Sequence, residues 1–183
     1  MTTPPERLWY QNIVESVFVR GPGPLMTPAL RELVKREGID LDRLLPAYPV
    51  ATVVRAARAA LPQLFPGQPA TEALRSFGVA SLRGYNETVL GGAVVGLLKL
   101  LGTRRALERL RISMSAGSNY LKTDFTPLSE RSARLTLSDV SEMPEFYQGI
   151  FEEGGRLIGA KNFRVSLEPG GGPGASYLVE WDG

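Results

Sequence analysis

Residues 84–102 read GYNETVLGGAVVGLLKLLG, and the packing of this stretch organises the rest of the predicted fold. In a helix, side chains four residues apart lie on the same face. One ridge of this helix would therefore carry three glycines and a threonine: Gly84, Thr88, Gly92 and Gly96. Each glycine costs a helix about 1 kcal/mol relative to alanine. The ridge thus predicts a close backbone neighbour, or a ligand pressed against that face.

The remaining circumference of this helix is strongly apolar. Leucine and valine cover it at Leu90, Val94, Leu97, Leu98 and Leu101. This pattern predicts a buried or interface helix rather than a surface one. Residues 88–101 would rise only about 21 Å as a helix, which is short of the roughly 30 Å of hydrocarbon in a bilayer. Three interpretations stay open: a central core helix, a dimer interface, or the wall of a ligand site.

The composition is that of an ordinary globular protein. The chain has 183 residues, of which 43% are hydrophobic and 22% are charged. These values predict a single domain over residues 1–183. The first residues lack the basic segment and apolar run of a secretory signal, so we expect a cytoplasmic protein with no membrane span.

Cysteine and histidine are both absent from the sequence. Without cysteine there are no disulfides, iron–sulfur clusters or thiolate zinc sites. Without histidine there is no Ser-His-Asp triad, no His-ligated haem and almost no route to catalytic zinc. We therefore expect no catalytic residues, no metal site and no cofactor, and we do not expect an enzyme.

The first half of the chain is predicted to be mainly helical. Residues 8–20, LWYQNIVESVFVR, are the exception, because their β-branched and aromatic residues favour a strand. Thr27 and Pro28 are typical of a helix start and Gly38 of a helix end, so a helix is expected between them. Three more helices follow from the spacing of apolar residues, over 50–64, 71–83 and 104–111.

Later in the chain, apolar residues recur at every second position. This alternation predicts a hairpin from residues 120–125 and 134–140, and a second hairpin from 163–167 and 177–181. Pro144 is expected to open a helix between the two hairpins. The predicted fold is α+β, with an N-terminal helical layer packed on a mostly antiparallel sheet and a C-terminal β-β-α-β-β unit.

Two charged regions are candidate sites. Acidic side chains gather at Asp139, Glu142, Glu145, Glu152 and Glu153. Paired carboxylates can carry out acid–base chemistry or bind metals, which makes this region the one candidate centre for an enzyme. Glu142 and Glu145 also fall near the start of the predicted helix, where carboxylates favour the helix dipole. The basic residues in 104–111 have no interleaved aromatic residues, so no nucleic-acid partner is expected.

Polar-tipped residues lie beside the glycine ridge and the first predicted hairpin. Tyr85, Asn119 and Tyr120 would each need hydrogen-bond partners if buried, and such groups often line mostly apolar pockets. Together with one aromatic residue and the ridge they form the predicted ligand-binding set: Gly84, Tyr85, Thr88, Gly92, Gly96, Asn119, Tyr120 and Phe146.

Five stretches carry a family resemblance. They are LMTPALRELVKREGIDLDRLLPAYPV at 25–50, GYNETVLG at 84–91, GTRRALERL at 102–110, SAGSNYLKT at 115–123 and MPEFYQGIFEEGGRLIGAKNFRVSL at 143–167. This pattern resembles an uncharacterised family found largely in myxobacteria. The resemblance extends over residues 25–181 and brings no biochemical function with it.

The order of helices followed by ββαββ is in turn similar to a superfamily of ligand-binding and interaction domains. It includes haem-nitric-oxide-binding domains, 4-vinyl-reductase-type sensor domains and the small subunits of the vesicle-tethering transport particle. The resemblance implies an axial histidine in the haem branch and an acylated cysteine in the tethering branch. This sequence contains neither residue type, so the resemblance implies an apolar-ligand sensor or a dimerising adaptor.

These observations lead to two hypotheses. The first is a non-enzymatic, cytoplasmic ligand-binding or sensory module with a small apolar pocket, which signals through contacts with a second copy or another protein. The second is a structural or adaptor protein that acts only through protein–protein interaction. Uneven charge favours such interactions: residues 99–134 carry a net charge of +5, and residues 139–183 carry −5.

Overall fold

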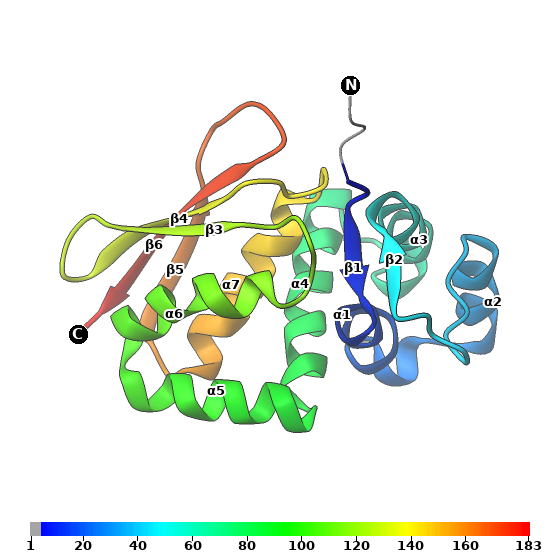
Figure 1. Cartoon of the computed structure of the whole chain (residues 1–183), viewed down its shortest axis with the longest axis horizontal. Helices are drawn as coiled ribbons and strands as arrows, with labels where there is room; N and C mark the ends of the chain where they lie inside the picture. The colour runs from blue at the N-terminus through cyan, green and yellow to red at the C-terminus, as the bar shows by residue number, and fades with distance from the viewer. Residues whose placement is uncertain (1–4) are drawn as a thin grey trace.

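The computed structural model describes residues 5–183, without the Arg111 side chain. Its first half contains β1 (Leu8–Tyr10), α1 (Gln11–Glu15), a π-helix (Ser16–Arg20), a 3-10 turn (Gly23–Leu25), α2 (Pro28–Arg36), β2 (Ala47–Pro49), α3 (Val50–Leu64) and α4 (Ala70–Asn86). Its second half contains α5 (Val89–Leu101), α6 (Thr103–Ser115), β3 (Thr123–Pro127), β4 (Ser132–Leu137), α7 (Pro144–Leu157), β5 (Lys161–Leu167) and β6 (Ala175–Asp182). In Figure 1, α4 runs between the N-terminal elements on the right and the larger sheet with α5–α7 on the left.

The predicted strand over 8–20 is wrong for most of its length. Only β1 is extended, and it pairs antiparallel with β2. The chain then becomes helical through α1 and the π-helix. The buried residues Val14, Val17 and Phe18 recur at helical spacing, so the period of the pattern outweighed its β-prone composition.

The helix predicted between Thr27 and Gly38 is confirmed. The Thr27 Oγ1 accepts a hydrogen bond of 3.3 Å from the backbone N–H of Leu30, which caps α2. Gly38 follows the helix with a φ of 106°, a backbone conformation that glycine adopts without strain. The helices predicted over 50–64 and 71–83 correspond to α3 and α4.

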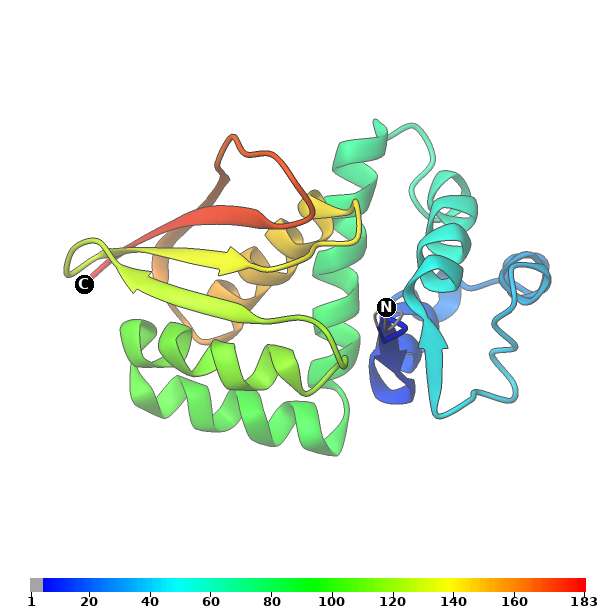
Figure 2. The same cartoon turned by 45° about the horizontal axis from the view of Figure 1, so that its top comes forward.

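The larger sheet confirms the predicted α+β class and the ββαββ unit. Its strand order is β3-β4-β6-β5, and every neighbouring pair is antiparallel. The inward-facing residues Leu135 and Tyr177 pair across β4 and β6. The ring of Tyr177 lies 5.0 Å from that of Phe151 on α7, so this helix packs against the sheet. Figure 2 shows α6 beneath the sheet and the yellow-orange α7 behind its strands, with the β5–β6 loop rising above.

Helices α4 and α7 cross with their backbones in contact. A Cβ added to Gly78 would overlap the carbonyl oxygen of Phe146, and one added to Gly149 would overlap that of Arg75. Both positions therefore require glycine. The same interface contains Glu153, whose side chain is 3% exposed.

The predicted glycine ridge does not exist. Helix α4 ends at Asn86, and Thr88 is the N-cap of a new helix, where its Oγ1 accepts a hydrogen bond of 2.9 Å from the Gly91 N–H. Because a threonine side chain can bond to the backbone at a helix start, it favours interruption of the helix at this position. Gly84 therefore lies on a different helix from Gly92.

Of the three interpretations of residues 88–101, the central core helix is wrong, whereas the dimer interface and the ligand-site wall stay predictions. In α5, Val89 is 94% exposed and Leu100 is 84% exposed, while only Gly91, Val95 and Leu98 are buried. The helix lies along the lower edge of the molecule in Figure 1. Within residues 5–183, every helix is too short or too polar to span a bilayer.

Candidate ligand-binding cavity

A partly open cavity of about 190 Å³ lies where the N-terminal segment meets α4, α6 and α7. Its walls are predominantly hydrophobic and aromatic. Representative apolar lining residues are Trp9, Val17, Leu82, Met114, Phe146 and Ile150. None of the described residues that line the cavity carries a formal charge.

Packed aromatic rings form one wall of the cavity. The centroid of the Phe146 ring lies 5.8 Å from the ring centroids of both Trp9 and Phe77. The ring centroid of Tyr147 lies 5.4 Å away. The Trp9 Nε1 donates a hydrogen bond of 2.8 Å to the hydroxyl of Tyr120. Interlocking rings and this hydrogen bond hold the wall in one geometry.

The polar groups of the cavity are few and neutral. The Ser16 hydroxyl donates to the Asn12 carbonyl at 2.8 Å, and the Ser81 hydroxyl donates to the Phe77 carbonyl at 2.7 Å. Both hydroxyl protons are thus donated to backbone carbonyls four residues earlier in the chain. Burial raises the pKa of Tyr85, so this phenol stays protonated at neutral pH.

Tyr147 is the second phenol of the cavity. Burial raises its pKa well above the ordinary range, with a further contribution from Tyr120. Both cavity tyrosines are therefore neutral hydroxyls rather than phenolates at neutral pH. The site can therefore hold an uncharged ligand and form a hydrogen bond with it. It has no charged side chain that could pair with a charged ligand.

A smaller apolar cavity of about 80 Å³ adjoins the first between α5, α6 and α7. It is lined by Val95, Leu98 and Leu107, and it shares Met114 and Ile150 with the larger cavity. Because Met114 is a flexible side chain between the two spaces, it can adapt to ligands of different shape.

Two of the predicted site residues, Tyr85 and Phe146, line the larger cavity. Tyr120 lies behind it, where its hydroxyl contacts both the Trp9 Nε1 and, at 2.8 Å, the Ser141 hydroxyl. These positions are consistent with the predicted ligand role of Tyr85 and Phe146, which stays a prediction.

The other predicted site residues lie elsewhere. Gly84 packs against the backbone at Gly21, and Thr88 caps α5. A Cβ added to Gly92 would meet the Asn86 carbonyl at 3.2 Å, whereas one added to Gly96 would meet nothing within 4 Å. The Asn119 side chain is outside the cavity lining, where its Oδ1 accepts a hydrogen bond of 2.8 Å from the Leu8 N–H and stabilises β1.

The N-terminal lining of the cavity was missed because residues 8–20 were predicted to be a strand. Trp9, Ser16 and Val17 all come from this segment, and the last two lie on the π-helix. π-Helical turns often occur at functional sites. The spacing of Ile13, Val14, Val17 and Phe18 was the signal that could have identified this lining.

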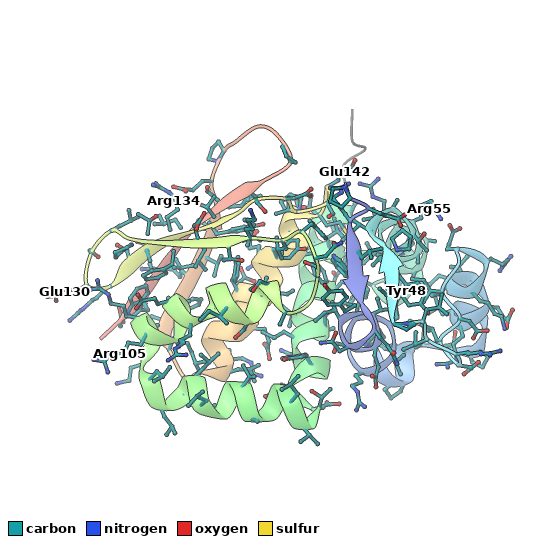
Figure 3. The ribbon with its side chains drawn as sticks, viewed as in Figure 1. Tyr48, Arg55, Arg105, Glu130, Arg134 and Glu142 are labelled. Atoms are coloured by element: carbon teal, nitrogen blue, oxygen red, sulfur yellow. The ribbon has the colours of Figure 1, made fainter. Side chains whose placement is uncertain are left out.

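The acidic residues at 139–153 do not form one centre. The carboxylate of Asp139 pairs with Arg7, and that of Glu142 pairs with Arg58 at 2.9 Å. Within residues 5–183, no group of three acidic side chains could hold a metal ion. An open groove of about 1040 Å³ runs between α3 and the β5–β6 loop, with Glu142 and Arg55 in its lining (Figure 3).

Solved structures that share this fold include H-NOX domains. A variant of Tt H-NOX superposes with a TM-score of 0.70 and 13% identity over 95% of each chain. An oxygen-binding H-NOX domain related to soluble guanylate cyclases has a TM-score of 0.65 and 12% identity, over 94% of this chain and 92% of that one. A mutant H-NOX of T. tengcongensis gives 0.64 and 12%, over 93% and 94%. At this identity the likeness establishes a shared fold.

The predicted relation to haem-nitric-oxide-binding domains is thereby confirmed for the fold. The relations to 4-vinyl-reductase-type domains and transport-particle subunits, and the restriction to myxobacteria, stay predictions. No curated protein matches the sequence significantly. The model of the family described as "Protein of unknown function (DUF2378)" matches residues 7–182, and the chain therefore belongs to this family.

Proposed function

We propose that this protein is a cytoplasmic, non-enzymatic sensory module that binds a small, uncharged, mostly apolar ligand in the 190 Å³ cavity. It signals the bound state through contacts with a second copy or another protein. The observation that carries the proposal is a cavity with aromatic walls and no charged lining residue. Its position, where the N-terminal segment meets α4, α6 and α7, allows a ligand to alter the packing between them.

The cavity volume limits the ligand to a small molecule. An engineered apolar cavity of about 150 Å³ binds benzene or xenon, whereas pockets for drug-sized ligands hold about 300–1,000 Å³. A volume of about 190 Å³ therefore favours a compound close to benzene in size. The Tyr85 hydroxyl, which stays protonated, can donate a hydrogen bond to one polar atom of such a ligand.

Haem does not fit this chain, although it is the group whose distortion and redox potential distinguish similar H-NOX domains. Haem iron is held by histidine, cysteine thiolate, methionine together with histidine, or tyrosine. The sequence has no histidine or cysteine, and burial keeps Tyr85 and Tyr147 in their protonated forms. The cavity is also smaller than the pockets of drug-sized ligands. We therefore derive no haem chemistry for this protein.

A second candidate function is that of an adaptor that binds proteins and takes no ligand. The observation that favours it is the exposed apolar surface of α5, where Val89 and Leu100 face outward. Exposed apolar patches on soluble proteins often mark interaction sites. The two functions differ in whether the cavity is used.

Mass spectrometry tests the proposal first. The purified protein is measured under native and then denaturing conditions, so that a co-purifying compound and the subunit number are obtained together. A small apolar compound released in stoichiometric amount on denaturation supports the sensory module. A protein that carries no compound and forms a defined assembly supports the adaptor.

Benzene as a probe tests the cavity directly. Near-saturating benzene should raise the melting temperature, because a ligand that binds only the folded state stabilises it. Ser113 lines the cavity and Ser115 on the same helix is exposed. We expect Ser113→Phe to fill the space and abolish the benzene shift, whereas Ser115→Phe should retain it. Equal shifts in both variants would show that benzene binds elsewhere.

A further inference from the structure

Helix α5 presents an apolar stripe to solvent. The stripe consists of four exposed residues with spacings of four, three and four: Val89, Ala93, Gly96 and Leu100. Val89 and Leu100 are 94% and 84% exposed, the two highest values among the large apolar residues of the described chain. Leu90 and Leu97 lie beside the stripe and are 59% and 56% exposed.

The spacing of the stripe is that of a coiled-coil seam. In a coiled coil, apolar residues alternate at intervals of three and four and pack into a facing helix. A seam of this kind is normally covered by a second helix. Among the described residues, α5 packs on α4 and α6 through its opposite face, which carries Val95 and Leu98.

The stripe is complementary to itself in the antiparallel orientation. It has large residues at its ends and small ones in the middle. An antiparallel pair of α5 helices places Val89 opposite the partner subunit's Leu100, and Ala93 opposite the partner subunit's Gly96. Nothing lies within 4 Å of a Cβ added at Gly96, so the two helices can approach closely there. Reciprocal pairing of this kind defines a two-fold interface.

The charges at the ends of α5 favour the same orientation. Glu87 immediately precedes the N-cap and Lys99 lies near the C-terminal end, and both are exposed. Neither forms an ion pair within residues 5–183. An antiparallel pair brings Lys99 towards the partner subunit's Glu87, whereas a parallel pair would place like charges together.

We propose that α5 is the self-association surface of this protein and pairs antiparallel with α5 of a second copy. The proposal deepens the proposed function, since it names the contact through which the bound state would be signalled. Leu90 belongs to both regions, because it lines the cavity and lies beside the stripe. The pairing itself uses otherwise different residues, so it can occur even if the cavity binds nothing.

The association should be weak. Helix α5 has 13 residues and is about 20 Å long, so two such faces bury less than the roughly 1,600 Å² of a standard interface. We therefore expect a dissociation constant on the order of 10 µM. Sedimentation velocity from about 1 to about 200 µM should show a monomer that becomes a dimer as concentration rises.

A charged substitution tests the surface. Leu100→Glu should keep the protein monomeric over this whole range, because it buries two carboxylates in the apolar seam. Leu128 provides the control, since it is also an exposed leucine, 46% accessible, but lies in the β3–β4 loop. Leu128→Glu should dimerise like the unmodified protein.

Cysteine pairing tests the orientation, because the chain has no cysteine of its own. Val89→Cys and Leu100→Cys are purified separately and oxidised alone or as an equal mixture. The antiparallel pair predicts a disulfide-linked dimer in the mixture and little in either variant alone. A mixture of Val89→Cys with Ser129→Cys, an exposed position in the β3–β4 loop, should not cross-link.

Three outcomes would overturn the proposal. The first is a protein that stays monomeric at all concentrations and forms no mixed disulfide. The second is a disulfide between two copies of Val89→Cys, which would indicate parallel helices. The third is flotation of the protein with anionic vesicles, abolished by Leu100→Glu, while no dimer forms. Benzene binding is measured separately by the melting temperature. If the unmodified protein stayed monomeric at every concentration while the benzene shift was intact, the α5 surface would be refuted and the sensory cavity would stand.

Discussion

Two regions of this protein have glycine within helices, but the glycines lie in different surroundings. At the crossing of α4 and α7, Gly78 and Gly149 are buried, and an added Cβ would overlap the facing backbone. On α5, Gly96 is exposed and faces open space. The comparison teaches that a glycine in a helix marks a place where another backbone can approach closely. Whether another element occupies that space depends on the fold.

The same two regions show that the more hydrophobic helix is not the more buried one. Helix α5 is rich in leucine and valine, yet much of its apolar surface is exposed. Helix α7 carries four carboxylate or arginine side chains, Glu145, Glu152, Glu153 and Arg156, yet it packs on both α4 and the sheet. The α7 charges are accommodated because its glutamates at 152 and 153 pair with arginines.

The largest effect should come from adding a methyl group at the helix crossing. Gly149→Ala is expected to destabilise the protein by about 3 kcal/mol or more, because the backbones of α4 and α7 must separate. Urea unfolding measures the loss. The control is Gly154→Ala on the same helix, where an added Cβ would meet Leu82 at an ordinary 3.6 Å. If both variants unfolded at the same urea concentration, the result would contradict the close backbone contact between α4 and α7 at Gly149.

A smaller effect should follow from neutralising Glu153 at this crossing. Arg83 Nε lies 3.0 Å from its Oε1, and Arg156 Nε lies 2.9 Å from its Oε2. Glu153→Gln should lower the free energy of unfolding by about 2 kcal/mol at neutral pH, because hydrogen bonds to a buried charge are lost. Glu130→Gln, at an exposed loop position (Figure 3), should change little.

The Glu153 effect should depend on pH with a defined sign. Burial alone would raise the pKa of Glu153, but hydrogen bonds from Arg156 and Arg83 outweigh it and lower the pKa below its ordinary value. A depressed folded pKa gives stability that is present above the unfolded pKa of about 4.3. This stability is lost as pH falls through the folded pKa. The difference between the protein and Glu153→Gln should therefore shrink below about pH 4, and a constant difference would contradict this ion-pair contribution.

At the exposed glycine of α5, substitution by alanine is expected to increase the stability of the protein, in contrast to Gly149→Ala. Gly96→Ala should stabilise the monomer by about 0.5–1 kcal/mol, because alanine is the better helix former and has space there. Unfolding is measured at low protein concentration, where self-association does not contribute. A loss of stability similar to that of Gly149→Ala would remove the contrast between the two regions.

The smallest effect on stability should come from Leu100→Glu. Its side chain is 84% exposed, so we expect the free energy of unfolding of the monomer to change by less than about 0.5 kcal/mol. The same substitution is expected to abolish self-association. A large destabilisation would instead mean that Leu100 packs within its own chain.

Much of the second half of the fold could be predicted from local patterns. The alternation in residues 134–140 and 177–181 predicted strands that pair in the structure as β4 and β6. Pro144 predicted the start of α7. These signals are short-range, because a strand shows its period and a helix shows its first residues within a few positions. The absence of histidine and cysteine also limited the chemistry directly.

The cavity and the two glycine regions depended on contacts between distant parts of the chain. Trp9 meets Phe146 across the cavity wall, and Gly149 meets the backbone of Arg75. No local period encodes such pairs, so residues 8–20 were predicted to be a strand and residues 84–96 a single ridge. The sequence by itself determined the α+β class, the ββαββ order and the exclusion of histidine and cysteine chemistry. Only the tertiary structure decided which glycines are packed, which apolar helix faces solvent and where a ligand would fit, because these depend on which surfaces meet.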